Sequence, residues 1–302
     1  MNDAGTPSAV FVGLCTLDII QLVDHVPARN EKLTARRQTV AAGGPATNAA
    51  ATFAHLGGFA TLLTAVGRHP LTAGIRSDLD EVKVRLVDWA TSRTSPPSVS
   101  SIMVTEATGE RAVVSTNAVA DPITAHGNLN DIVESADAVQ IDGHHPDLGL
   151  AAVTAARAAR RLTVLDAGSW KPGTEKLLPF LDVVAYSADF HPPGTGGGDD
   201  IATFLRDYGV TWIALTRGAD SVRWWAPGAA GEVSVPEAPV VDTLGAGDVF
   251  HGALTYGLAS AAGQPLDPDR FAGLLDDAAR VASAACGFFG TRTWMAGPDQ
   301  TG

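Results

Sequence analysis

The chain has 302 residues, of which 45% are hydrophobic and 18% charged, and its net charge at pH 7 is −12. This length is ample for a large core, as one large α/β domain or two smaller ones. The acidic balance argues against a nucleic-acid backbone as partner, although Mg²⁺ and backbone N–H groups can still hold nucleotide phosphates. Cys15 and Cys286 are the only cysteines, too few for a disulfide framework or a cysteine metal cluster.

The N-terminal region does not look like a leader or an anchor. It has no basic segment, and Asp18 interrupts its apolar run. No apolar stretch approaches the roughly 20 residues that a membrane-spanning helix needs. We therefore expect no membrane association and a cytoplasmic location.

The first elements predicted along the chain are strands, at 9–14, 17–23 and 35–42. Asp18 lies just past the first apolar strand. Open α/β sheets place ligand-binding groups at that position, so Asp18 is a candidate binding residue. A turn or cap residue is an equally good interpretation.

A small-residue helix is predicted after the third strand. Gly43, Gly44 and Pro45 open it, and Gly57 and Gly58 close it. The two leading glycines would let the backbone approach a ligand. Asn48 falls in the first turn, where its amide could grip a hydroxyl group or serve only the local backbone.

A strand at 61–66 and a helix-like pattern over 71–89 follow. Two further strands, 99–105 and 112–116, flank a turn at 106–110 and predict a hairpin. The region 17–40 also lacks an intervening helix. We therefore expect both regions to form a small sheet outside the main layer, as a lid over a binding site.

From residue 136 onward short strands alternate with helices, which predicts a parallel sheet with helices on both faces. His144 and His145 follow one of these strands. We expect them to lie in a loop that lines the ligand-binding edge of the sheet, rather than in a metal site. The expected strands are 138–141, 162–165, 183–186 and 212–215, the helices 148–161, 201–208 and 269–286, and the ribbon strands 221–225 and 232–235.

The most informative stretch is 240–254. Val240 and Val241 suit the end of a strand, and Gly245 and Gly247 suit a tight turn. An amphipathic helix follows from residue 246. Its free N–H groups and dipole would suit a phosphate, but Asp248 would repel one. A carboxylate beside an anion-binding turn is what a site needs if it deprotonates a hydroxyl group while the turn receives a phosphoryl group. The alternative is that Asp248 only caps the helix.

Two motifs resemble signatures of the PfkB (ribokinase-like) family of sugar and nucleoside kinases. Residues 43–48 (Gly-Gly-Pro-Ala-Thr-Asn) resemble the first signature and residues 242–248 (Asp-Thr-Leu-Gly-Ala-Gly-Asp) the second. The match runs from about residue 10 to 290. Segments 13–24, 106–111 and 285–287 look most like ketohexokinases and sulfofructose kinases.

The resemblance implies a fold and a reaction. The fold would be a three-layer α/β/α sandwich, a single domain over 1–302, with a mostly parallel sheet and a lid formed by about 15–42 and 97–118. The reaction would be ATP-dependent phosphorylation of a sugar hydroxyl, of a ketohexose or a related sugar, with Mg²⁺. An exposed lid edge would allow a homodimer.

The resemblance also implies residue roles. Asp248 would be the general base, and Gly245, Ala246 and Gly247 would offer N–H groups to the phosphoryl group. Gly43 and Gly44 would lie at the sugar, whose hydroxyls Asp18, Gly44 and Asn48 would hold. The nucleotide would lie near Thr216, Arg217, Gly218, Ala282 and Cys286; a small buried hydrophobe is an equally good interpretation of Cys286. Asp242 and Thr243 would lie near a K⁺ site.

Two departures and two rival functions remain. The Asn-x-x-Glu motif that organises Mg²⁺ in many members reads Ser187-Ala188-Asp189-Phe190 here, and Asp189 could substitute for the glutamate. Pro45 replaces a polar residue. One rival is a nucleoside or sugar-phosphate kinase, the latter needing an anion clamp from Arg29, Lys32, Arg36 or Arg111. The other rival is a non-catalytic sugar or nucleotide sensor, which the presence of Asp248 disfavours.

Overall fold

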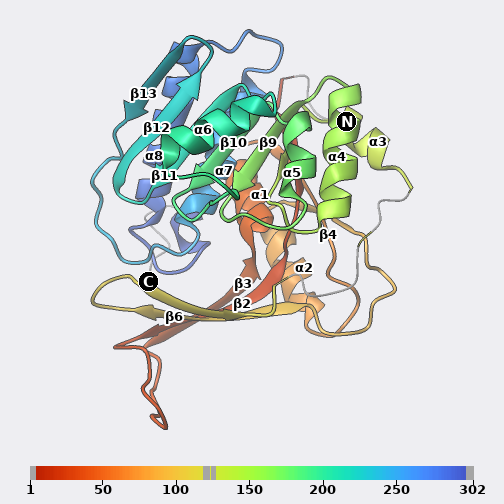
Figure 1. Cartoon of the computed structure of the whole chain (residues 1–302). Helices are drawn as coiled ribbons and strands as arrows, with labels where there is room; N and C mark the ends of the chain where they lie inside the picture. Colours follow the sequence, from red (N-terminus) through yellow and green to blue (C-terminus); the bar gives the residue numbers. More distant parts are fainter. Residues whose placement is uncertain (1–4, 118–122, 124–126, 297–302) are drawn as a thin grey trace.

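The computed structural model describes residues 5–117, 123 and 127–296, which form two β-sheets and the helices that cover one of them (Figure 1). The larger sheet has nine strands in the order β13-β12-β11-β10-β9-β8-β1-β4-β5. All neighbours are parallel from β11 to β5, and β12 and β13 add an antiparallel ribbon at one edge. The strands are β1 (Ser8–Val12), β4 (Phe59–Thr64), β5 (Arg85–Asp88), β8 (Ala138–Ile141), β9 (Leu162–Ala167), β10 (Val183–Ser187), β11 (Trp212–Arg217), β12 (Asp220–Ala226) and β13 (Ala229–Val233).

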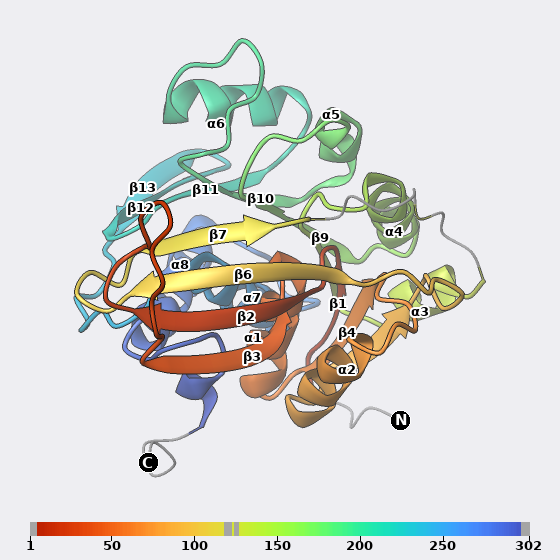
Figure 2. The same ribbon diagram turned by 90° about the horizontal axis from the view of Figure 1, so that it is seen from below.

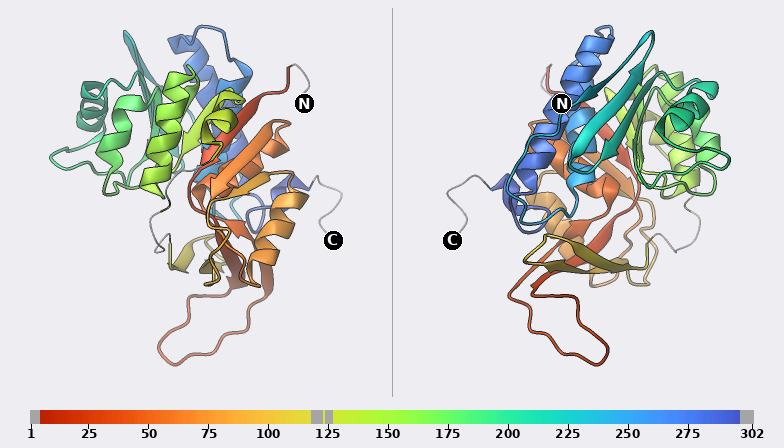
Figure 3. Two further views of the ribbon diagram at one scale, coloured as in Figure 1. Left: turned by 90° about the vertical axis from the view of Figure 1, so that its right-hand side faces the viewer. Right: turned by 60° about the vertical axis from the view of Figure 1, so that its left-hand side comes forward.

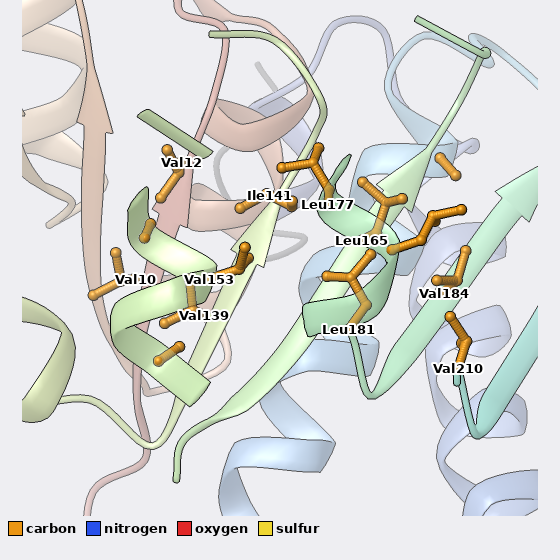
Figure 4. Close-up of a cluster of buried hydrophobic side chains, with 14 of the residues drawn as sticks. Val10, Val12, Val139, Ile141, Val153, Leu165, Leu177, Leu181, Val184 and Val210 are labelled. Carbon is orange, nitrogen blue, oxygen red and sulfur yellow. The ribbon is translucent and has the colours of Figure 1, made fainter. Parts of the chain in front are cut away.

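Helices pack on both faces of this sheet, which makes three layers. Along β1 the side chains alternate: Val10 and Val12 join the core beneath one set of helices, and Ala9 and Phe11 join the core beneath the other. Figure 4 shows the first of these cores. The first face carries α3 (Leu129–Glu134), α4 (Pro146–Ala158), α5 (Thr174–Leu177) and α6 (Gly198–Asp207), and the second carries α1 (Pro45–His55), α2 (Thr72–Glu81), α7 (Ala246–Ser260) and α8 (Pro268–Ala285).

The second sheet is the predicted lid sheet, and it joins the two regions that lack helices. Its order is β3-β2-β6-β7, with β2 (Thr16–Val23) and β6 (Ser98–Thr105) parallel at the centre (Figure 2). β3 (Arg37–Gly43) and β7 (Arg111–Ser115) are its antiparallel edges. Because β2 starts directly after β1, the sheet lies at the carboxyl end of the main strands. The connection from β2 to β3 projects from the body (Figure 3).

Three local predictions were wrong. The helix-like pattern over 71–89 divides into α2 and the short edge strand β5, whose half-exposed residues carry little apolar alternation. The short helices α3 and α5 were not predicted. Val240 and Val241 belong to no strand, and both are exposed, at 55% and 37%.

The lid sheet leaves apolar side chains exposed on both edge strands: Val40 on β3, and Val113 and Val114 on β7. Unpaired edges of this kind can recruit another strand. A homodimer through the lid stays a prediction. Within the described residues, no helix is both long and apolar enough to cross a membrane.

Close packing of α1 on α7 generates a stability prediction. A Cβ at Gly252 would lie 2.4 Å from the carbonyl oxygen of Ala49, whereas a Cβ at Gly273 on α8 would meet nothing within 4 Å. We expect Gly252→Ala to destabilise the protein by about 1–3 kcal/mol because backbone must move. Gly273→Ala should instead stabilise by about 0.5–1 kcal/mol. Urea unfolding of both variants checks the opposite signs; equal effects would contradict the packing argument.

Candidate active site

The second glycine motif forms a tight turn at the start of α7. Gly245 directly precedes the helix with a left-handed φ of 74°, which disfavours a side chain. No side chain in the described part of the chain caps this helix end. Its first N–H groups therefore suit an anion. A Cβ on Gly247 would meet nothing within 4 Å, so that face is open, whereas the Ala246 N–H turns back to the Thr243 carbonyl at 3.3 Å.

Asp242 and Thr243 brace this turn. The Asp242 carboxylate accepts the N–H of Leu244 at 2.8 Å and that of Gly290 at 2.9 Å. The Thr243 hydroxyl donates to the carbonyl of Gly109 at 3.2 Å and accepts from Arg111, also at 3.2 Å. The turn is thereby joined to the β6–β7 hairpin of the lid sheet and to the segment after α8.

Asp248, in the first turn of α7, meets Asn48 of α1. Asn48 Nδ2 donates to Asp248 Oδ2 at 2.7 Å, so the two glycine motifs converge. Burial and the neighbouring Asp166 carboxylate raise the pKa of Asp248, and the Asn48 hydrogen bond and His251 only partly oppose them. A carboxylate with a raised pKa is a better proton acceptor than an ordinary one, once it is deprotonated.

Asp18 lies on β2, packed against the first glycine motif. Its side chain is buried, and Thr16 Oγ1 donates to Asp18 Oδ1 at 2.5 Å. Burial raises the pKa of Asp18. A Cβ on Gly43 would lie 1.8 Å from Asp18 Oδ2, and Gly44 has a φ of 98°, so both positions require glycine.

Two buried carboxylates that the sequence patterns did not single out lie near this site. Asp142 follows β8 and accepts the N–H groups of Leu14, Ala46 and His144 at 2.8–3.2 Å. Burial pushes the pKa of Asp142 up, but His144, the Leu14 N–H and Lys171 together lower it to about 2. The position of Asp142 at a strand's carboxyl end is the same signal that marked Asp18.

The other buried carboxylate, Asp166 at the end of β9, lies beside His251 of α7. His251 Nε2 is 3.1 Å from Asp166 Oδ1, and both residues are buried. Burial and Asp142 raise the pKa of Asp166, and burial lowers that of His251 to about 4. Asp166 Oδ2 and His251 Nδ1 have no hydrogen-bond partner in the described residues.

Arg292, after α8, also reaches the site and was not predicted. It donates to the Asn48 side-chain oxygen at 2.9 Å and to the Ala42 carbonyl at 2.6 Å, and it pairs with Asp78 of α2 at 3.2 Å. An isolated arginine in a C-terminal loop carries no local signal of such a role.

The predicted nucleotide-side residues lie at the end of β11 and the end of α8. Arg217 directs its guanidinium to the Ser221 carbonyl at 2.9 Å, so it braces its own hairpin, and Gly218 adopts a left-handed φ of 64°. Thr216 contacts the Tyr186 carbonyl at 3.4 Å. Cys286 and Ala282 are half-buried, and the Cys286 carbonyl accepts the N–H groups of Val241 and Asp242. The end of α8 thus lies against the segment that leads into the glycine turn before α7.

The segment that replaces Asn-x-x-Glu follows β10. Ser187 donates to the Gly168 carbonyl at 2.7 Å, and Asp189 is exposed. Phe190, at the position of the glutamate, is fully buried and packs against Trp170 and Tyr186. A carboxylate could not occupy that apolar site without a large cost.

His144 of the histidine pair and Arg36 of the lid have acidic partners nearby. His144 Nδ1 lies 3.3 Å from Asp142, and His145 starts α4 with a φ of 56°. No cluster of three or more metal-ligating side chains occurs among the described residues. Arg36 pairs with Asp24 and Glu106.

Comparison with known proteins agrees with this geometry. Residues 6–295 match the model of the pfkB family carbohydrate kinases. The fold is similar to a putative ribokinase from Agrobacterium tumefaciens (24% identity, TM-score 0.81, 96% of this chain and 94% of that one). It is also similar to an Arabidopsis thaliana ribokinase complexed with ribose and ATP (22%, 0.75, 95% and 94%) and to a Xylella fastidiosa fructokinase with bound ATP (19%, 0.76, 95% and 94%). The chain belongs to the pfkB family of carbohydrate kinases, ATP-dependent sugar phosphotransferases.

Proposed function

We propose that this kinase transfers the γ-phosphoryl group of ATP to a hydroxyl of a neutral sugar, a ketohexose or a related one. Asp248 takes the hydroxyl proton, and backbone N–H groups of the Gly245–Gly247 turn stabilise the charge on the phosphoryl group in flight. The observation that carries the proposal is the 2.7 Å contact between Asn48 and Asp248, beside an uncapped helix N-terminus.

Charge favours a neutral sugar over a sugar phosphate. Asp18, Asp166 and Asp248 lie around the site, and each has a raised pKa because burial disfavours its charge. An anionic substituent there would add repulsion. Of the candidate clamp residues, Arg36 already pairs with the carboxylates of Asp24 and Glu106. Arg111 contacts Thr243, in the glycine turn before α7. Arg29 and Lys32 are exposed on the projecting β2–β3 connection.

Asp18 and Asn48 supply complementary groups for the sugar. The Asp18 carboxylate can accept hydrogen bonds from hydroxyls, and the Asn48 amide can donate one to a hydroxyl oxygen. Pro45, at the first position of α1, adds no N–H to this set. Selectivity at that point therefore rests on shape, which supports a sugar preference different from that of members with a polar residue there.

The residues present fit Mg²⁺ that arrives with ATP. Mg²⁺ commonly uses one or two protein carboxylates together with substrate phosphates and water, so a full protein cage is unnecessary. Asp189, which is exposed in the segment after β10, is the carboxylate of that segment and would hold Mg²⁺. When bound, Mg²⁺ neutralises charge on the phosphates.

K⁺ dependence stays a prediction. Each Asp242 oxygen accepts one N–H and keeps a second lone pair, so the carboxylate can still ligate a cation. Arg111 already brings a positive charge to Thr243. No step of the proposed reaction depends on K⁺.

The base assignment predicts the effect of Asp248→Asn. This variant should fold normally and lose about 10²–10⁴-fold in kcat, because nothing then accepts the hydroxyl proton. ATP consumption with Mg²⁺ would be followed against fructose, other ketohexoses, ribose, sulfofructose, fructose phosphates and adenosine. Asp277→Asn, an exposed aspartate on α8, is the matched control and should be unaffected.

Two outcomes would contradict the proposal. Turnover by Asp248→Asn close to that of the wild type would exclude Asp248 as the base. Sugar or nucleotide binding by calorimetry, with no turnover of any acceptor by the wild type, would favour the sensor. A preference for adenosine or a fructose phosphate would favour the rival kinase.

The raised pKa of Asp248 predicts the pH dependence. The base acts only when it is deprotonated, so kcat/KM should fall as pH drops through the raised pKa. An aspartate with the ordinary pKa of about 3.9 would keep activity to much lower pH. Asn48→Ala removes a hydrogen bond that lowers this pKa and should move the acidic limb to higher pH. A limb near pH 4 in the wild type would contradict the assignment.

A further inference from the structure

Arg292 joins three segments that meet beside the candidate base, and all three of its side-chain nitrogens donate hydrogen bonds. Its side chain is 15% exposed. Nη1 donates to Asn48 Oδ1 at 2.9 Å and to the Thr291 carbonyl at 3.2 Å, Nη2 donates to the Ala42 carbonyl at 2.6 Å, and Nε donates to Asp78 Oδ2 at 3.2 Å. Nη2 also lies 3.2 Å from Asp78 Oδ2 as an ion pair. A guanidinium has five N–H donors in a rigid fork, and here four of them have an acceptor.

This contact decides which way the Asn48 amide points. The oxygen and the nitrogen of an amide have nearly the same shape, so their partners determine the orientation. Arg292 offers only donors, so the amide atom facing it must be the oxygen. The flipped amide would place N–H against the guanidinium and oxygen against the Asp248 carboxylate, two repulsive contacts in place of two hydrogen bonds.

The same guanidinium holds the end of lid strand β3. The Ala42 carbonyl accepts from Arg292, and the Ala42 N–H donates to Asp78 Oδ2 at 3.1 Å. Ala42 directly precedes Gly43 and Gly44, which pack against Asp18 and Leu14. The Arg292–Asp78 pair therefore sets the position of the lid strand relative to Asn48.

We propose that Arg292 is a positioning residue for phosphoryl transfer: it fixes the Asn48 amide as a donor toward Asp248 and toward the acceptor hydroxyl. This inference rests on the proposed function. Asn48 Nδ2 has two hydrogens, one of which bonds Asp248. The other has no hydrogen-bond acceptor among the described residues and can donate to the hydroxyl oxygen, which leaves the hydroxyl's own proton to point at Asp248.

The test combines three variants. Arg292→Met removes every donor at similar side-chain length, and Arg292→Lys keeps the charge but not the fork. We expect each to lower kcat/KM by up to about 10²-fold, because small misplacements of positioning groups have effects of that size. Arg280→Met, an exposed arginine of α8 paired with Asp276, is the control and should be neutral. Urea unfolding establishes that the variants are folded.

A double-mutant cycle separates positioning from a structural or direct charge effect. If Arg292 acts through Asn48, Arg292→Met should add little to Asn48→Ala. If it acts through stability or its own charge, the two losses should multiply. Multiplying losses, or an Arg292→Met enzyme within about twofold of wild type, would overturn the proposal.

A second readout needs no turnover. Carboxyl ¹³C NMR would follow the titration of Asp248, and the Asp248→Asn variant would assign its signal. The titration should move to higher pH in Arg292→Met than in the wild type. In the double variant Arg292→Met/Asn48→Ala it should lie no higher than in Asn48→Ala alone. Asp142, Asp166 and His251 also face Asp248, and they are unchanged in all variants. An unmoved titration overturns the Arg292 proposal. Absent turnover in the wild type overturns the proposed function instead, so the two failures are distinguishable.

Discussion

The rest of this structure depends on the hydrogen bond between Asn48 and Asp248. It joins the first turn of α1 to the first turn of α7, and the two residues lie 200 positions apart in the chain. The bond requires the two helices to approach closely, which small residues allow: a Cβ at Gly252 would already collide with α1. Both glycine turns then face one place, where the proposed reaction would bring the sugar and the phosphoryl group together.

Electrostatics explains how an acidic site can handle phosphate. Asp248 beside a phosphate would be repulsive if both carried full charge, but burial and Asp166 raise its pKa. In the proposed reaction the N–H groups of α7 offset charge on the transferring group at fixed positions, so no reorganisation is needed during the transfer. Under the same proposal the buried carboxylates favour a neutral polyol as acceptor, because its hydroxyls can donate to them.

The lid sheet connects the two glycine turns mechanically. β2 and β3 carry Asp18 and the glycine turn, and the β6–β7 hairpin reaches Thr243 through Gly109 and Arg111. The parallel pairing of β2 with β6 holds these two hairpins in one sheet. A displacement of the lid would therefore act on both halves of the site, a coupling suited to excluding water during transfer.

The sequence by itself determined the local features: the strands and most helices of the alternating half, the two glycine turns, the position of Asp18, and a lid built from two helix-free regions. These follow from short-range rules of apolar spacing, glycine conformation and helix ends. β5 was missed because four half-exposed residues carry too little pattern. Only the tertiary structure decided that Asp142 and Asp166 lie beside the site, that Phe190 fills an apolar position, and that Arg292 donates a hydrogen bond to Asn48. Those contacts join residues up to 250 positions apart, and apart from the place of Asp142 at the end of a strand no local pattern indicates them, because they arise only when the helices pack on the sheet.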